Sequence, residues 1–413
     1  MVRLPPRLRP YFPHLKAVYT QSTRFAAPIN RQLGRLRGGH LPTGSVATME
    51  LAAESTGGRS VLARPAETIS RVGAHGLPPA HPMFCSFQET IPRVAIAELP
   101  NGRVLGTQSA VITANGDILQ ELSAYFGTTR PQEHPLFLNP FPGDPRQVSG
   151  RLGVLATRGD QNYYHFLVDA LPRLALFAQA QQIDPPEHWY VPAAQPFQRE
   201  LLELIGLREP DYIDSVAFPH VQAQTLVVPG LPSTTVTNPP WVVGWLRGKL
   251  LADRSPIEPT ESIYVTRGSA ANNRVVTNEA EVVESLAARG FTVIDPGRMS
   301  VTEQIDAFAR AALIVAPHGA ALTNLIFASP GSAVVELLPS GAVLPNCYWT
   351  LADNVPGLQY RYLLSGGRPA AARLAAALVS DIVVDLPQLD RLLDELVARR
   401  AHSGDNGSTR ERQ

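Results

Sequence analysis

The sequence is poor in cysteine, with only Cys85 and Cys347 among its 413 residues. Two isolated cysteines lack the paired spacing of a zinc site, so we expect free thiols in a reducing compartment, with one long-range disulfide as the alternative. Long apolar runs are also missing. No stretch of about 18 apolar residues is present, so a membrane-spanning helix is not expected. The N-terminus lacks the apolar middle segment of a secretion signal, which predicts a cytoplasmic protein.

The chain has no net charge, because 36 acidic residues balance 36 basic ones. A neutral protein lacks the electrostatic footprint of nucleic-acid binding, so we expect no nucleic-acid partner. The balance is uneven at the start of the chain, where no acidic residue precedes Glu50. The basic residues of this segment are Arg3, Arg7, Arg9, Lys16, Arg24, Arg31, Arg35 and Arg37. They predict either an arm that contacts an anionic surface at the inner face of the membrane or a solvated, loosely ordered leader.

Hydrophobic residues make up 44% of the chain and charged residues 17%, as in soluble globular proteins, and the length allows two domains. Residues 1–80 are rich in Pro, Arg and Gly without periodicity, so we expect a poorly defined region. We expect an α/β domain over 81–254, a proline-containing boundary at 255–260, a second α/β domain over 261–380, and a C-terminal helix with a polar tail over 381–413.

The first domain is expected to combine hairpin strands with strands and helices that alternate. The turn dipeptides Asn101-Gly102 and Asn115-Gly116 accompany the apolar runs of Val104–Leu119, which predicts β-hairpins. The other expected elements are, in order, strand Leu152–Thr157, helix Asn162–Ala180, strand Trp189–Val191, helix Phe197–Ile205, strand Thr225–Val228 and helix Trp241–Leu251.

The second domain alternates regularly between strand and helix. Its helix after Ser300 begins with a capping box, because Glu303 stands three residues later. The expected elements are strand Ile263–Thr266, helix Glu279–Arg289, strand Phe291–Ile294, the capped helix, strand Leu313–Ala316, helix Ala320–Phe327 and strand Ala333–Leu338. This order predicts a parallel sheet with right-handed crossovers. Ligands of such sheets bind at the carboxyl ends of the strands, here at Thr266-Arg267, Pro317–Thr323 and Glu336–Pro339.

The junction between the third strand and the following helix is suited to phosphate. Gly319 lets the backbone approach a ligand, Ala320 is small, and the helix start offers free N–H groups, although packing alone explains many such junctions. Arg267 and Arg274 lie near the same edge, and guanidinium groups match phosphate oxygens, although both could be solvated loop residues. Glu336 ends the fourth strand and is expected to bind ribose hydroxyls or to be a salt-bridge partner.

A second group of chemically capable residues lies in the first domain. His165, Asp169 and Arg173 recur every four residues and share one face of the expected helix. A His-Asp pair at this spacing can supply a general base whose tautomer is fixed by its partner. The alternative is a stabilising pair on the protein surface.

Taken together, these segments resemble glycosyltransferase family 61. The matching stretches are Asn162-Tyr163-Tyr164-His165-Phe166, Asp169, Leu171-Pro172-Arg173-Leu174, Ile263-Tyr264-Val265-Thr266-Arg267, Arg274, Asn278-Glu279, Gly290-Phe291, Glu303-Gln304, Pro317-His318-Gly319-Ala320, Thr323-Asn324, Glu336-Leu337 and Pro339. The order and spacing of these blocks are more specific than any single one. The resemblance covers residues from about Gly102 to Leu364.

The resemblance implies a GT-B-like α/β architecture, in which two Rossmann-like domains with parallel sheets face each other across a cleft. It implies inverting, metal-independent transfer of a hexosyl or pentosyl group from a nucleotide-diphosphate donor, expected to be a UDP-sugar, without a cofactor. No Asp-x-Asp pair stands at a loop placed to hold a metal. The acceptor is expected to be a glycan or lipid-linked glycan, in capsular or exopolysaccharide biosynthesis.

The same resemblance implies roles for individual residues. Tyr164 and Arg173 are expected on the acceptor side, and His165 or Asp169 is expected to be the general base. The expected donor-binding residues are Arg267, Arg274, His318, Gly319, Ala320, Thr323, Asn324 and Glu336. Two alternatives are a nucleotide-sugar epimerase of the same fold and a non-catalytic nucleotide- or carbohydrate-binding subunit.

Overall fold

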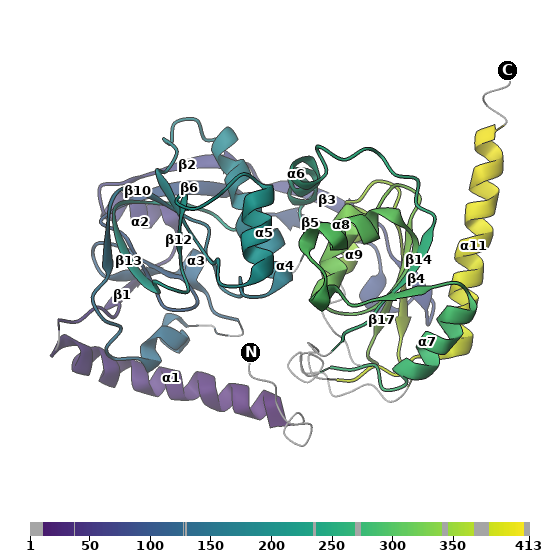
Figure 1. The fold of residues 1–413 in the computed structure, drawn as a ribbon. Coiled ribbons are helices and arrows are strands. Elements are labelled where there is room, and N and C mark those ends of the chain that lie inside the picture. The colour runs from purple at the N-terminus through teal and green to yellow at the C-terminus, as the bar shows by residue number, and fades with distance from the viewer. Residues whose placement is uncertain are drawn as a thin grey trace.

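The computed structural model describes residues 11–36, 38–126, 128, 130–233, 237–268, 274–340, 346–366 and 380–408. Figure 1 shows two lobes of mixed α/β structure, each built around one large sheet. Within the described residues no helix is long and apolar enough to cross a membrane. Both cysteines are free, Cys85 at the surface and Cys347 in the core.

The sheet of the first lobe is mixed rather than parallel throughout. Its strands are β1 (Gly44–Val46), β2 (Arg59–Arg64), β6 (Val94–Pro100), β7 (Arg103–Leu105), β8 (Ala110–Ile112), β9 (Asp117–Leu119), β10 (Arg146–Val154), β11 (His188–Val191), β12 (Tyr212–Asp214) and β13 (His220–Pro229). Strands β13, β10, β11 and β12 pair in parallel, whereas β2, β6, β7 and β8 form antiparallel pairs. The predicted hairpins are thus confirmed, and the expectation of a parallel sheet in this domain holds for only part of it.

The sheet of the second lobe is parallel in every pairing, in the order β15-β14-β16-β17-β18-β4. Its strands are β14 (Glu261–Val265), β15 (Thr292–Ile294), β16 (Ala311–Pro317), β17 (Ala333–Leu338), β18 (Gln359–Leu364) and β4 (His75–Leu77). The sequence predicts four of these six strands, β14 to β17, and two of them, β16 and β17, are buried along their whole length, as is typical of central strands in parallel sheets. A separate pair, β3 (Glu67–Arg71) and β5 (Phe87–Ile91), is antiparallel.

Residues 11–77 are folded, which differs from the poorly defined region expected over 1–80. They form α1 (Phe12–Arg35), β1, α2 (Met49–Ser55), β2, β3 and β4. Strand β4 pairs with β18 and so belongs to the second lobe, far from its neighbours in sequence. These strands are three to six residues long and depend on distant partners, so they leave no periodicity for a sequence pattern to detect.

The helix expected over 162–180 is divided into three types of turn. It begins as α4 (Tyr163–His165), continues as the π-type segment η5 (Phe166–Ala170) and ends as the 3-10 segment η6 (Leu171–Ala178). Pro172 has no N–H to donate, which is consistent with the change of helix type at this point. The helical turn that contains Asp169 is therefore wider than an α-helical turn.

The remaining helices cover the sheets and the boundary between the lobes. In the first lobe they are α3 (Gln120–Ser123), α5 (Pro196–Leu204) and the short turns η3 (Pro131–Glu133) and η4 (Pro135–Leu138). Between and within the second lobe they are α6 (Pro240–Leu250), α7 (Glu279–Ala288), η7 (Pro296–Arg298), α8 (Val301–Arg310), η8 (Ala320–Phe327), α9 (Asn346–Asp353) and α11 (Leu386–Ser408). The short turn η2 (Pro82–Phe84) belongs to the second lobe, because the Phe84 ring stacks on Tyr362 of β18 with centroids 3.8 Å apart. The capping box of Ser300 and Glu303 is confirmed at the start of α8.

The two lobes are packed together along α5, α6, α8 and η8, as Figure 1 indicates. One buried apolar cluster contains side chains of both lobes, including Leu202, Leu246, Phe308 and Leu325. The carboxylate of Glu200 on α5 accepts hydrogen bonds of 2.8 Å from the backbone N–H groups of Val301 and Thr302, the first turn of α8. A helix N-terminus favours a negative charge, so this contact joins the lobes where an open cleft was expected.

Candidate functional site

Two arginines converge on one backbone carbonyl at the carboxyl ends of β14 and β16. Arg267 Nη1 lies 2.5 Å and Arg274 Nη1 lies 3.2 Å from the oxygen of His318. Arg274 also donates from Nε to the carbonyl of Ser380 at 3.1 Å. Arg274 is 3% exposed, which rules out the solvated-loop interpretation for this residue. The sequence therefore predicted correctly that both arginines meet at the strand ends.

Desolvation disfavours the charged form of both arginines. Desolvation lowers the pKa of Arg267, and it lowers that of Arg274 to about 10, with repulsion from Arg267 as the second cause. Among the described residues, Arg267 has no ion-pair partner, and its buried Nε has no hydrogen-bond acceptor. The unpaired Nε of Arg267 therefore retains donor capacity for an anion.

Gly319 makes room for the first of these arginines. A Cβ at this position would collide with Nη1 of Arg267, whereas the backbone itself is extended and suits any residue. The glycine is therefore required by the close approach of the guanidinium group and not by its φ angle. Gly319 and Ala320 are both partly exposed at the start of η8, which leaves this end of the helix accessible.

Glu336 is the centre of a buried hydrogen-bond chain. Its Oε1 lies 2.5 Å from His318 Nδ1, and its Oε2 accepts from the hydroxyl of Tyr360 at 2.5 Å. Burial lowers the pKa of His318 and raises that of Tyr360. Both carboxylate oxygens have internal partners and Glu336 has no exposed surface, which supports the alternative of a structural partner, while the ribose contact stays a prediction. His318 is oriented by this chain, and its carbonyl holds both arginines.

Thr323 and Asn324 are also fully buried, and they hold η8 in place. The Thr323 hydroxyl donates to the carbonyl of Ala320 at 2.7 Å. Asn324 donates from Nδ2 to Gln304 Oε1 on α8 at 2.8 Å and accepts a 2.7 Å bond from the hydroxyl of Tyr163 on α4. These bonds give Thr323 a structural role within η8 and Asn324 one between the lobes, while the donor contacts expected of both stay a prediction.

His165 and Asp169 form the pair that the spacing predicts. Nδ1 of His165 lies 2.7 Å from Oδ2 of Asp169, and the two side chains are 22% and 23% exposed. A carboxylate on one ring nitrogen fixes the tautomer and leaves Nε2 free to take a proton. The Phe126 ring packs against the imidazole with centroids 5.1 Å apart, so the ring orientation is held from a second side.

Arg173 and Tyr164 do not present polar groups to an acceptor. Arg173 is 1% exposed, and its guanidinium donates to the carbonyls of Pro229 and Leu155, at 2.9 Å from Nε and 3.1 Å from Nη1. Burial lowers its pKa to about 9. The Tyr164 hydroxyl is buried and donates to Asn238 Oδ1 at 3.1 Å. Both residues shape the site from within the core, which corrects the expected acceptor-side role.

Aromatic contacts connect the histidine pair with the arginine pair. The ring of Tyr164 packs on His165 at 5.2 Å and on Tyr348 at 5.7 Å, and Tyr348 packs on His318 at 5.1 Å. Tyr348, on α9, is a residue that the sequence analysis missed. Its only sequence signal is an aromatic pair with Trp349, which has no spacing relationship to the other motifs.

The chain is similar to known proteins over this same region. Residues 163–335 match the family described as Glycosyltransferase 61. The match covers less than half of the chain, and these residues are called the family 61 segment below. Three relatives carry the name protein O-linked-mannose beta-1,4-N-acetylglucosaminyltransferase 2. They come from Tetraodon nigroviridis (32% identity over 109 residues, 25% of this chain and 18% of the relative), Danio rerio (36% over 97 residues, 22% and 16%) and Bos taurus (34% over 115 residues, 25% and 19%). The similar segment spans less than a fifth of the length of these relatives.

The family 61 segment is flanked by a buried carboxyl group that the sequence analysis did not identify. Asp160 is 2% exposed and accepts a 2.8 Å bond from the backbone N–H of Thr157. Burial raises the pKa of this carboxyl to about 7, although His165 and Arg173 act in the opposite direction. Asp160 therefore titrates close to neutral pH beside the pair formed by His165 and Asp169.

In the described part of the chain, no cluster of three or more His, Cys, Asp or Glu side chains is arranged to hold a metal.

The titration of Asp160 predicts a pH dependence of stability. Its folded-state pKa lies above the unfolded value, so the folded protein binds the proton more tightly and stability falls as pH rises from about 4 to about 7. The full loss is at most about 4 kcal/mol, since one pKa unit corresponds to 1.36 kcal/mol. Asp160→Asn keeps an acceptor for Thr157 and should flatten this part of the curve. Urea unfolding between pH 4.5 and 7.5 measures it, with the exposed Asp253→Asn as control. Parallel curves for Asp160→Asn and wild type would contradict the assignment.

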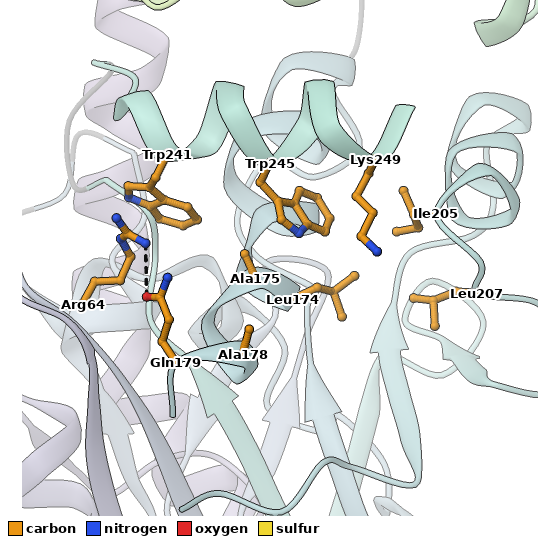
Figure 2. A pocket seen from close by; sticks show the side chains of 10 residues that line it. All are labelled: Arg64, Leu174, Ala175, Ala178, Gln179, Ile205, Leu207, Trp241, Trp245 and Lys249. Carbon is orange, nitrogen blue, oxygen red and sulfur yellow. Dashed lines mark hydrogen bonds between the residues drawn. The ribbon is translucent and has the colours of Figure 1, made fainter. Parts of the chain in front are cut away.

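A pocket of about 520 Å³ lies between α6 and η6, and all of its lining residues except Arg64 belong to the family 61 segment (Figure 2). Trp241, Trp245 and Lys249 project into it from α6, opposite Ala175 and Ala178 of η6. The remaining lining residues are Arg64, Leu174, Gln179, Ile205 and Leu207. The buried Nε1 of Trp241 has no acceptor among the described residues. Flat indole surfaces with donor groups at the rim suit a ring-shaped ligand rich in acceptors, and none of the predicted donor-binding residues lines this pocket.

Proposed function

We propose that the protein is an inverting, metal-independent glycosyltransferase that moves a sugar from a nucleotide-diphosphate donor to a glycan acceptor. The observation that carries the proposal is the convergence of Arg267 and Arg274 on the His318 carbonyl, beside the accessible start of η8. Such donors match the oxygens of a diphosphate. The match of residues 163–335 to family 61 supports the same reaction class.

In the proposed reaction His165 is the general base. Nε2 of His165 takes the proton of an acceptor hydroxyl as that oxygen forms a bond to the anomeric carbon from the face opposite the diphosphate. The bond between the anomeric carbon and the diphosphate oxygen breaks with its electron pair on the leaving group, whose charge Arg267 and Arg274 stabilise. Asp169 holds the imidazole and stabilises its protonated form. The anomeric configuration is inverted because one displacement occurs.

Further aspects of the proposal concern the partners. We assign a GT-B-like arrangement, with the donor on the second lobe and the acceptor on the first, and a cytoplasmic location. The name of the relatives makes a UDP-linked N-acetylglucosamine the first donor to test. Capsular or exopolysaccharide glycans, free or lipid-linked, are the first acceptors, and O-mannosylated protein is the alternative from the relatives' name. The pocket of Figure 2 suits further sugars of such an acceptor.

The proposed arginine site should bind UDP without a divalent metal. Titration calorimetry with UDP in the presence of a chelator should give the same dissociation constant as in the presence of Mg²⁺, because the cationic side chains supply the charge that a metal would otherwise supply. Loss of binding in chelator would overturn the metal-independent assignment.

Product analysis tests the reaction itself. With an N-acetylglucosamine donor and a panel of glycan acceptors, a transferase releases UDP faster when acceptor is present and forms an inverted glycosidic bond. Formation of an epimeric nucleotide sugar without UDP release would favour the epimerase alternative. UDP binding with neither reaction across the panel would favour a non-catalytic binding subunit.

A further inference from the structure

The N-terminal helix α1 is fixed to the first lobe by one of its faces. Ala27 on this face is fully buried. Asn30 donates from Nδ2 to the carbonyl of Phe137 at 2.7 Å, and the guanidinium of Arg31 lies 4.6 Å above the ring of Phe137. Figure 1 shows α1 lying along the outside of this lobe, and it contacts the turns η3 and η4. Its orientation is therefore set by the fold.

The opposite face of α1 presents a continuous row of large apolar side chains. This outer stripe consists of Tyr11, Leu15, Val18, Phe25, Ile29, Leu33 and Leu36, each between 41% and 79% exposed. The intervals are three, four or seven residues, which places all of them on one side of a helix. Phe25 and Ile29 in the middle are 73% and 60% exposed. Soluble proteins rarely expose such a row without a partner.

The positive charge of the segment that forms α1 indicates which kind of partner the stripe binds. Residues 11–36 carry four basic side chains, Lys16, Arg24, Arg31 and Arg35, and no acidic one, although the whole chain is neutral. Two copies meeting through this stripe would bring together two helices of the same positive charge, with Arg24 and Arg35 exposed on each. An anionic lipid surface instead offers opposite charge to the basic side chains and a hydrocarbon boundary to the apolar ones.

We propose that α1 is an interfacial helix that docks the protein on an anionic lipid bilayer, with the outer stripe inserted at the level of the headgroups. Arg24 and Arg35 are exposed on α1, and their long side chains can reach phosphate groups, whereas the guanidinium of Arg31 is held on the first lobe by the Phe137 ring and the Pro42 carbonyl. The apolar contacts and the charge attraction are both required, because either one alone gives weak and reversible binding. Docking through α1 does not depend on the reaction proposed above.

Vesicle co-sedimentation of the full chain tests this docking. We expect binding to vesicles of phosphatidylcholine mixed with phosphatidylglycerol, and binding at least about tenfold weaker to phosphatidylcholine alone or in high salt. The double variant Phe25→Ser, Ile29→Ser should lower the partition coefficient to anionic vesicles by about tenfold or more. Both side chains are exposed, so circular dichroism should be unchanged. The matched control is Val72→Ser with Val397→Ser, two apolar residues that are 72% and 51% exposed elsewhere on the surface.

A second variant separates charge from apolar contact. Arg24→Gln with Arg35→Gln should abolish the preference for anionic vesicles, while Phe25 and Ile29 remain in place. Absence of binding to anionic vesicles by wild type, or equal binding by the serine variant and its control, would overturn the proposal. So would light scattering that shows a dimer dispersed by the serine variant without any vesicle binding, since the stripe would then join two copies. Donor binding by calorimetry should be the same in all variants, which keeps this test independent of the proposed reaction.

Discussion

Replacing His165 with alanine should lower kcat by about a hundred- to ten-thousandfold, the contribution of a general base. The dissociation constant of the donor should stay unchanged, because His165 lies on α4 of the first lobe and the arginine pair lies on the second. A residue that acts only in the transition state lowers kcat without weakening ground-state binding. Steady-state kinetics with saturating donor, together with calorimetry, measure the two effects separately.

The role of Asp169 follows from a double variant. If Asp169 acts through His165, as the 2.7 Å contact indicates, the double alanine variant should be little slower than His165→Ala alone. Asp169→Asn should lower kcat, because an amide can hold the ring but does not stabilise the positive charge that forms on it during proton transfer. His75→Ala, at an exposed position on β4, is the control. If His165→Ala keeps near-normal turnover, His165 and Asp169 are a surface pair without a catalytic role.

Arg267→Ala should weaken donor binding by about ten- to a hundredfold, since a charge-assisted hydrogen bond contributes about 1.5 to 3 kcal/mol. Arg274→Ala should have a similar effect on affinity. It should also lower stability, because this residue is buried and bonded to the Ser380 carbonyl. Calorimetry with UDP measures the affinity, and Arg298→Ala, at an exposed position of the same lobe, is the matched control. If both variants bind UDP with unchanged affinity, the diphosphate does not bind at the arginine pair.

The second lobe was the most predictable part of the fold. Strands such as Leu313–Ala316 and Ala333–Leu338 are buried on both faces and are therefore continuous apolar runs, which fix their type and their parallel order. Strand β4 could not be predicted in the same way. Its three residues carry no pattern, and its place in the sheet depends on pairing with β18, nearly three hundred residues later.

The site was predictable where backbone geometry alone brings residues together. Arg267 and His318 follow neighbouring parallel strands, so their proximity is a consequence of topology. The sequence could not predict which of the motif side chains are buried. Glu336, Thr323 and Asn324 occupy motif positions, yet their side chains turn inward to partners from distant elements such as Tyr360 and Tyr163. A motif identifies residues that matter without separating those that touch a ligand from those that support the site.

The bonds that Glu200 makes to the first turn of α8 limit how the enzyme can move. A hinge opening along α5 and α8 would break these two bonds and also separate Tyr163 from Asn324. Hydrogen bonds to a charged group contribute about 1.5 to 3 kcal/mol each, so an opening here costs several kcal/mol before any apolar surface is exposed. The open population would then be well below about one molecule in a hundred. For the proposed reaction we therefore expect substrates to enter and leave mainly while this boundary is shut, with any gating motion in elements on other sides of the arginine pair.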